Sequence, residues 1–168
     1  MCGIIGVVSR PPTRPTPRAE NVLGGLDAAI ESIPTVARVI ESARVVDVAL
    51  RGMPGVLALI GQNELIAAMN TRLDRLGEFA RAREAELDEN VAELDADGLE
   101  AANAELIELS DVLWAIRNDR LRTAREVEQL AGADAPASAL GCYLVVQQAL
   151  SAIDRLEVRG RDSAGVHL

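Results

Sequence analysis

The apolar residues between positions 65 and 116 repeat at helical spacing in two long series. In the first series, which only Arg83 interrupts, the residues are Leu65, Met69, Leu73, Leu76, Ala80, Leu87, Val91 and Leu94. The second follows the polar sequence DADG and contains Leu99, Ala102, Leu106, Leu109, Leu113 and Ile116. Steps of three and four residues place these side chains on one face of each helix. Residues 62–131 are therefore predicted to form an antiparallel helical hairpin with its tip at 95–98. Asp97 with Glu100 is expected to cap the second helix.

Composition agrees with helices that pack through aliphatic side chains. The chain has 168 residues, of which 49% are hydrophobic and only 2% aromatic, so Leu, Val, Ile and Ala must build the core. That length suits one domain of ordinary size. Few aromatic side chains are available to stack on bases, and the net charge of −9 opposes contact with phosphate backbones. Nucleic-acid binding is therefore not expected.

Helices are also predicted on both sides of the hairpin. Apolar spacing predicts one helix up to Pro34 and a second that begins at Val36, while Gly52, Pro54 and Gly55 indicate a turn. Residues 19–131 are thus expected to be helical throughout. Residues 132–142 read as a loop, and 143–160 as one more amphipathic helix, with its apolar stripe through Val145. Trp114 and Phe79 are the large side chains that could anchor a partner on this hairpin, although the simpler interpretation of both is core.

The two ends of the chain read differently from its middle. Residues 3–8 form a short apolar run typical of a buried strand, and 164–168 resemble the start of another. Residues 10–18 contain four prolines, which neither a helix nor a sheet interior accepts, so this segment is predicted to be an extended linker. The expected fold class is mainly α, a helical bundle with a long antiparallel helical hairpin, plus one or two short β-strands.

Several classes of site are not expected. Two cysteines, Cys2 and Cys142, make neither a disulfide framework nor a zinc site, and Cys142 is interpreted as structural. No metal and no cofactor are predicted. The apolar start is too short for a secretory signal, and no segment reads as a membrane span. The expected location is the cytoplasm.

The most specific motifs stand at the two ends. MCGIIGVV at 1–8 and LEVRGRDSAGV at 156–166 together resemble the N-terminal-nucleophile (class II) glutamine amidotransferases. The RG-x-DSAG pattern is closest to the glutamine–fructose-6-phosphate aminotransferases, the glucosamine-6-phosphate synthase type. The resemblance covers residues 1–9 and 143–168, about a fifth of the chain. It implies that the strands belong to an incomplete αββα N-terminal-nucleophile hydrolase fold, with 19–131 as a helical insertion.

The resemblance implies catalytic roles for the terminal residues. Removal of Met1 would leave Cys2 as the first residue, and its own α-amine, with an ordinary pKa of about 7.7–8.0, would serve as base for the thiol. The thiolate would attack the side-chain amide of L-glutamine and release ammonia through a thioester. Arg159 and Gly160 would lie beside Cys2, and Asp162 would fix the following turn. Without the resemblance, Cys2 would be read as a small hydrophobic residue of a strand.

The resemblance also implies what the 168 residues lack. The family's other glutamine-binding and oxyanion-hole residues and its sugar-phosphate domains cannot be placed in this sequence. The expectation is therefore the N-terminal part of a longer aminotransferase, inactive alone, which would pass ammonia to a sugar phosphate bound by other domains. The expected partners are L-glutamine and either the rest of the parent enzyme or a second copy of the chain. The alternative function is a non-catalytic helical interaction or scaffolding module.

Overall fold

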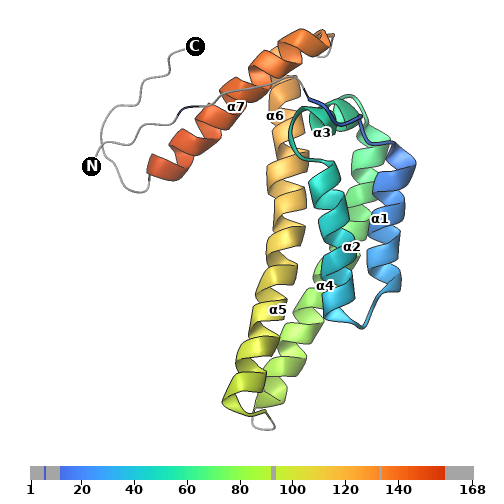
Figure 1. Ribbon diagram of the computed structural model, residues 1–168, viewed down its shortest axis with the longest axis vertical. Coiled ribbons are helices and arrows are strands. Elements are labelled where there is room, and N and C mark those ends of the chain that lie inside the picture. Colours follow the sequence, from blue (N-terminus) through green and yellow to red (C-terminus); the bar gives the residue numbers. More distant parts are fainter. Residues whose placement is uncertain (1–5, 7–11, 92–93, 133, 158–168) are drawn as a thin grey trace.

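The computed structural model describes residue 6 and residues 12–91, 94–132 and 134–157, with side chains as far as 153. These residues are mainly helical, as predicted, and contain no strand. Apart from Gly6, both segments predicted as strands lie outside the described residues. The helices, shown in Figure 1, are α1 (Ala19–Glu31), α2 (Val36–Ala49), α3 (Gly52–Leu59), α4 (Asn63–Glu89), α5 (Ala96–Trp114), the π-helix η2 (Ala115–Leu121), α6 (Arg122–Ala131) and α7 (Ala137–Glu157).

Four of these helices form a bundle in which chain neighbours are not always spatial neighbours. α1 packs against α2 and α4, and α5 packs against the same two helices, so α2 and α4 lie diagonally opposite each other. The short helix α3 carries the chain across this diagonal, over one end of the bundle (Figure 1). The end covered by α3 is therefore where the chain passes from α2 to α4.

The predicted turn at residues 52–55 is instead the start of α3. Gly52 has φ of +67°, which lets the chain reverse directly after α2. Pro54 fits in the first helical turn, where backbone N–H groups have no intrahelical acceptor. A Cβ on Gly55 would lie 1.9 Å from the carbonyl oxygen of Leu50, so only glycine allows this close approach. Gly52, Pro54 and Gly55, which were predicted to form a turn, thus allow a sharp junction between α2 and α3.

The core is aliphatic, as the composition predicted. Its largest fully buried side chains are Leu26, Leu50, Leu59, Met69, Leu73, Leu76, Leu109, Ile116, Val22, Val39, Val46 and Val127. Phe79 packs against this core and is partly buried. The interpretation of Trp114 as core is wrong, because its residue is 52% exposed. It stands seven residues after Ile107, which is also exposed, and therefore lies on the outward face of α5.

The predicted hairpin is present, and it extends well beyond the bundle. α4 has 27 residues, whereas α1 and α2 have 13 and 14. Figure 1 shows α4 and α5 continuing side by side past the ends of α1 and α2. The buried positions of α4 end at Ala80, and those of α5 begin at Leu106. Between them Val91 and Leu94 are exposed, so the distal arm has little core of its own.

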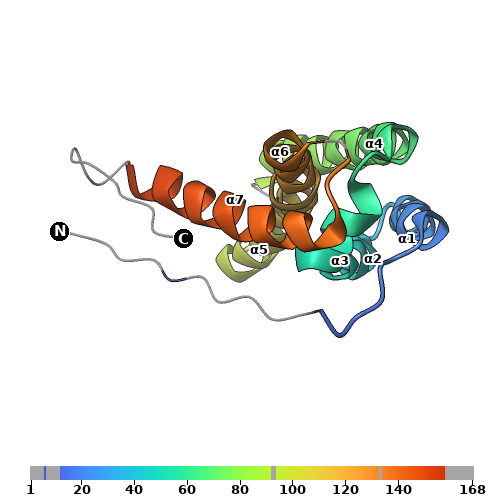
Figure 2. The same cartoon turned by 90° about the horizontal axis from the view of Figure 1, so that it is seen from above.

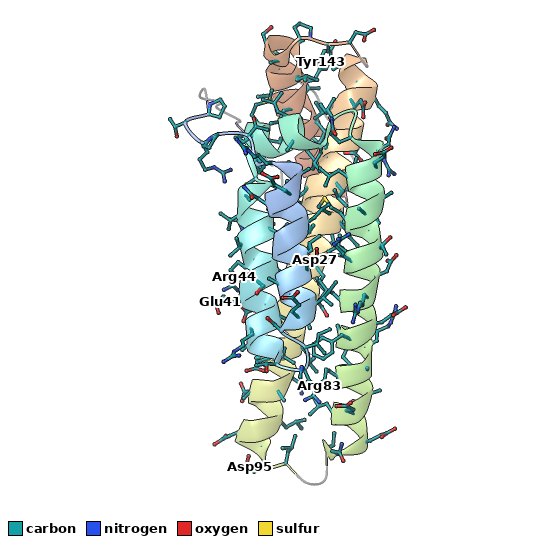
Figure 3. The ribbon with its side chains drawn as sticks, turned by 90° about the vertical axis from the view of Figure 1, so that its right-hand side faces the viewer. Asp27, Glu41, Arg44, Arg83, Asp95 and Tyr143 are labelled. Atoms are coloured by element: carbon teal, nitrogen blue, oxygen red, sulfur yellow. The ribbon has the colours of Figure 1, made fainter. Side chains whose placement is uncertain are left out.

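The tip and cap of the hairpin differ from the prediction. α5 begins at Ala96, so the turn precedes it and residues 96–98 are already helical. The cap is Asp95, whose Oδ1 accepts a hydrogen bond from the Gly98 N–H at 2.8 Å (Figure 3). Asp97 does not serve as the N-cap because it lies inside the first turn, where a carboxylate favours the positive end of the helix dipole.

Ion pairs join neighbouring helices of the bundle. Arg72 of α4 donates to both carboxylate oxygens of Asp27 in α1, at 2.7 and 3.0 Å, and lowers the pKa of that carboxyl. A lowered pKa in the folded state stabilises the fold above the ordinary value of 3.8 and ceases to do so at lower pH. Arg44 of α2 pairs with Glu108 of α5. Arg83 is less well satisfied, because its buried Nε has no hydrogen-bond partner among the described residues.

α7 begins earlier than predicted. The expected loop at 132–142 is shorter because α7 starts at Ala137, directly after Pro136, whose carbonyl accepts from Leu140 N. The buried side of α7 is formed by Leu140, Leu144 and Gln147, and the predicted apolar stripe through Val145 is only partly buried. α7 packs against α6 and α3, and Figure 2 shows its later turns projecting from the bundle.

The described helices also bear on two expectations, the role of Cys142 and the absence of a membrane span. Cys142 lies within α7 and is exposed, and its interpretation as a structural residue stays a prediction. No helix in the described part of the chain is long and apolar enough to cross a membrane.

Adjacent glycines in α1 provide a matched test of the packing between α1 and α2. A Cβ on Gly25 would lie 2.5 Å from Cγ2 of the buried Val46, whereas a Cβ on Gly24 would meet nothing within 4 Å. Gly24→Ala should stabilise the fold by up to about 1 kcal/mol, since alanine favours helix. Gly25→Ala should be less stable than Gly24→Ala by about 1–3 kcal/mol because it overpacks the interface. Urea unfolding followed by circular dichroism measures both, and equal effects would contradict this packing.

Candidate functional site

The residues that the sequence singled out for catalysis are Cys2, Arg159, Gly160 and Asp162. All four lie outside the described residues, so their predicted proximity stays a prediction. The structure does describe the two segments that lead toward them. These are residues 12–18, which precede α1, and α7, which precedes Arg159. Both segments lie at the end of the bundle that α3 covers, and the side chains gathered there form the candidate site.

The π-helix η2 positions Asn118, Asp119 and Arg120 at this site. α5, η2 and α6 follow one another as a single rod from Ala96 to Ala131. Its buried residues step by three and four up to Ile116, and the next buried residue is Leu121, five positions later. A five-residue step is what one π-helical turn requires to keep apolar side chains on the same face. This gap in the apolar spacing was the signal in the sequence that could have located η2.

Asp47 is the buried charge at the centre of the site. Its side chain is 3% exposed. Oδ1 accepts from Nε of Arg120 in η2 at 2.9 Å, and Oδ2 accepts from Arg51, the residue between α2 and α3 that caps α3, at 2.5 and 3.0 Å. A carboxylate removed from water in this way needs such partners, because an unpaired buried charge is strongly destabilising. Asp47 therefore fixes the end of α2 to the π-helix.

The segment before α1 is attached to the same place. The guanidinium of Arg14 donates to the carbonyls of Val48 and Arg51, each at 2.7 Å. These carbonyls belong to the last turn of α2 and the residues after it, where helices leave acceptors without intrahelical donors. The proline-rich segment is thus hydrogen-bonded to the end of α2 that Asp47 anchors.

A polar cavity of about 330 Å³ lies between this anchored end and α7. Its lining comes from the end of α2, α3, η2, α6 and α7: Leu50, Gly52, Val56, Asn118, Asp119, Arg120, Arg122, Thr123, Leu144, Gln147, Gln148, Ser151 and Ala152. Gln147 is 4% exposed, and its amide nitrogen donates to Glu126 and to Ser151 Oγ at 2.6 and 2.7 Å. Among the described residues, the lining offers amide, hydroxyl, carboxylate and guanidinium groups for hydrogen bonding and includes no thiol or imidazole.

No metal site is present in the part of the chain that the structure describes. No group of three or more His, Cys, Asp or Glu side chains there could hold an ion. Asp47, the key residue of the site, was missed in the sequence. It stands four residues after Ala43 and seven after Ile40, on the buried face of α2. A charged residue at an apolar register position was the available signal.

Comparison with known proteins identified no relative: no family model, curated protein or solved structure matches the chain.

Two Asp→Asn variants test the importance of the buried carboxylate. Asp47→Asn should lower the free energy of unfolding by about 3 kcal/mol, because it leaves Arg120 buried without its counter-charge. Asp74→Asn is the matched control, since Asp74 pairs with Arg117 of the same π-helix but its side chain is 65% exposed. It should cost at most about 1 kcal/mol. Chemical denaturation measures both, and similar small losses would show that Asp47 does not anchor the fold.

Proposed function

We propose that this chain is part of a glutamine-hydrolysing amidotransferase of the N-terminal-nucleophile class, in which Cys2 attacks glutamine and residues 19–131 form an inserted helical unit. The glucosamine-6-phosphate synthase type is the closest match to the RG-x-DSAG motif. The chemistry rests on the pair of terminal motifs, in the order that the family has them. The geometry supports the proposal through one observation, namely where the two ends of the helical unit lie.

An insertion is tolerated best when its two ends lie close together, since the host fold must continue from one end to the other. Arg14, before the first helix, is hydrogen-bonded to the carbonyl of Arg51. The next residue, Gly52, lines the same cavity as Leu144 of α7. The segments before and after the helical unit therefore contact neighbouring residues at the same end of the bundle. The closure entropy of a long insertion grows slowly, by about 0.6 kcal/mol for each doubling of its length.

The proposed reaction needs no metal and no separate histidine. The free α-amine of Cys2 would take the proton of the Cys2 thiol, and the thiolate would add to the amide carbon of L-glutamine. Ammonia would leave, and water would then hydrolyse the thioester to glutamate. Arg159 and Gly160 would hold the amino terminus, and Asp162 would shape the turn that follows. Ammonia would pass to a sugar phosphate bound by domains outside these 168 residues.

A helical interaction module is the second candidate function. The observation that favours it is the distal arm formed by α4 and α5, which extends past α1 and α2 and leaves Val91, Leu94 and Ile107 exposed. The two functions are compatible, because an arm on an inserted unit can bind a partner while the host performs catalysis.

Labelling of Cys2 tests the catalytic proposal. In the full-length protein, Met1 should be absent, and a glutamine-mimicking electrophile should modify Cys2 in step with the loss of glutaminase activity. Peptide mass spectrometry measures both the loss of Met1 and the modification of Cys2. Cys142→Ala is the control, because Cys142 is an exposed thiol on α7 and its removal should leave activity unchanged. Active protein that retains Met1, or a Cys2→Ala variant that keeps glutaminase activity, would rule out the mechanism.

A further inference from the structure

A groove runs along the outer side of the bundle between α2 and α5. Its volume is about 540 Å³, and it shares no lining residue with the polar cavity described above. On the α2 side its apolar wall is made by Ile40, Val45 and Val48. Ile40 is buried, whereas Val45 is 63% and Val48 44% exposed. Two exposed valines three residues apart on one helix leave apolar area that water contacts.

The rim of the groove is acidic. Glu41 of α2 and Glu105 of α5 line it and form no ion pair among the described residues. Arg44 also lines the groove, but its guanidinium is engaged by Glu108 across the two helices. Figure 3 shows Glu41 and Arg44 on the outer side of α2. The groove therefore presents an apolar wall with two carboxylates that form no ion pair among the described residues.

The neighbouring arm adds to this negative charge. Residues 81–108, which include Glu105, contain ten Asp and Glu against two Arg, a net charge of −8 out of the chain's −9. A second copy of the chain on this groove would bring a like-charged arm toward it, which costs free energy. A cationic partner gains from the same field. Charge thus selects a basic partner over self-association.

We propose that the groove between α2 and α5 binds a basic amphipathic helix of a partner protein. The lining of α2 from Ala37 to Val48 extends about 16 Å at 1.5 Å per residue, which is three turns of a docked helix. Apolar side chains at i, i+3 and i+7 of the partner cover Val45 and Val48, and flanking arginines pair with Glu41 and Glu105. The inference is independent of the chemistry proposed for Cys2, because it uses no residue of the terminal motifs.

Two synthetic helical peptides test the proposal on the full chain. Both carry the same leucine face, and one has arginine flanks while the other has glutamate flanks. Fluorescence anisotropy should show that the arginine peptide binds at least about tenfold more tightly, a difference of about 1.4 kcal/mol. Its binding should weaken when salt is raised, because the flanking charges are exposed.

Surface variants locate the binding. Val45→Gln with Val48→Gln should weaken the arginine peptide about tenfold, and Glu41→Gln with Glu105→Gln should weaken it and reduce its salt dependence. The control is Glu64→Gln with Glu78→Gln, because these residues lie on α4, diagonally opposite α2. This double variant should leave the affinity for the arginine peptide unchanged. The proposal is overturned if neither peptide binds, if both bind equally, if the valine variants bind as the wild type does, or if sedimentation shows instead that the groove pairs two copies of the chain.

Discussion

The burial of Asp47 is the constraint on which the rest of the structure depends. A carboxylate that is 3% exposed must be neutralised inside the protein, and its partners are Arg51 and Arg120. Arg120 stands in the π-helix, which joins two straight helical segments with a five-residue step between buried positions. This one interaction therefore ties α2 to the rod of α5, η2 and α6, at the end where α3 crosses the bundle. Arg14 is hydrogen-bonded at the same end, and the first turns of α7 pack there.

α7 packs against this end of the molecule, on α6 and α3. It is held by a small second apolar cluster, in which Leu140 and Leu144 meet Val56 and Val127, and by the hydrogen bonds of Gln147. A helix that packs on one side and projects on the other suits the proposed function, in which α7 is part of the host amidotransferase fold. In that proposal the polar cavity is the junction between the host and the inserted helical unit.

The sequence predicted the helices whose apolar residues repeat periodically, and it missed single features such as the buried charge of Asp47. The two apolar series, Leu65 to Leu94 and Leu99 to Ile116, predicted α4, α5 and their antiparallel pairing, because burial in a bundle follows helical periodicity. The cap was assigned to Asp97 in place of Asp95, since both positions offer a carboxylate and only backbone geometry separates them. Asp47 was missed because the partners of a buried charge, here Arg120, are distant in sequence. The predicted catalytic residues, Cys2 among them, lie outside the described residues and stay predictions.

The central claim is that the segments before and after the helical unit leave it at the same end. A distance measurement between spin labels on Thr16→Cys and Ala137→Cys tests this most directly, with Cys2 and Cys142 replaced by alanine. Both labelled positions are exposed. The account predicts one narrow distribution well below about 40 Å, the length of the 27-residue α4 at 1.5 Å per residue. A separation near that length, or a broad distribution without a short component, would contradict it.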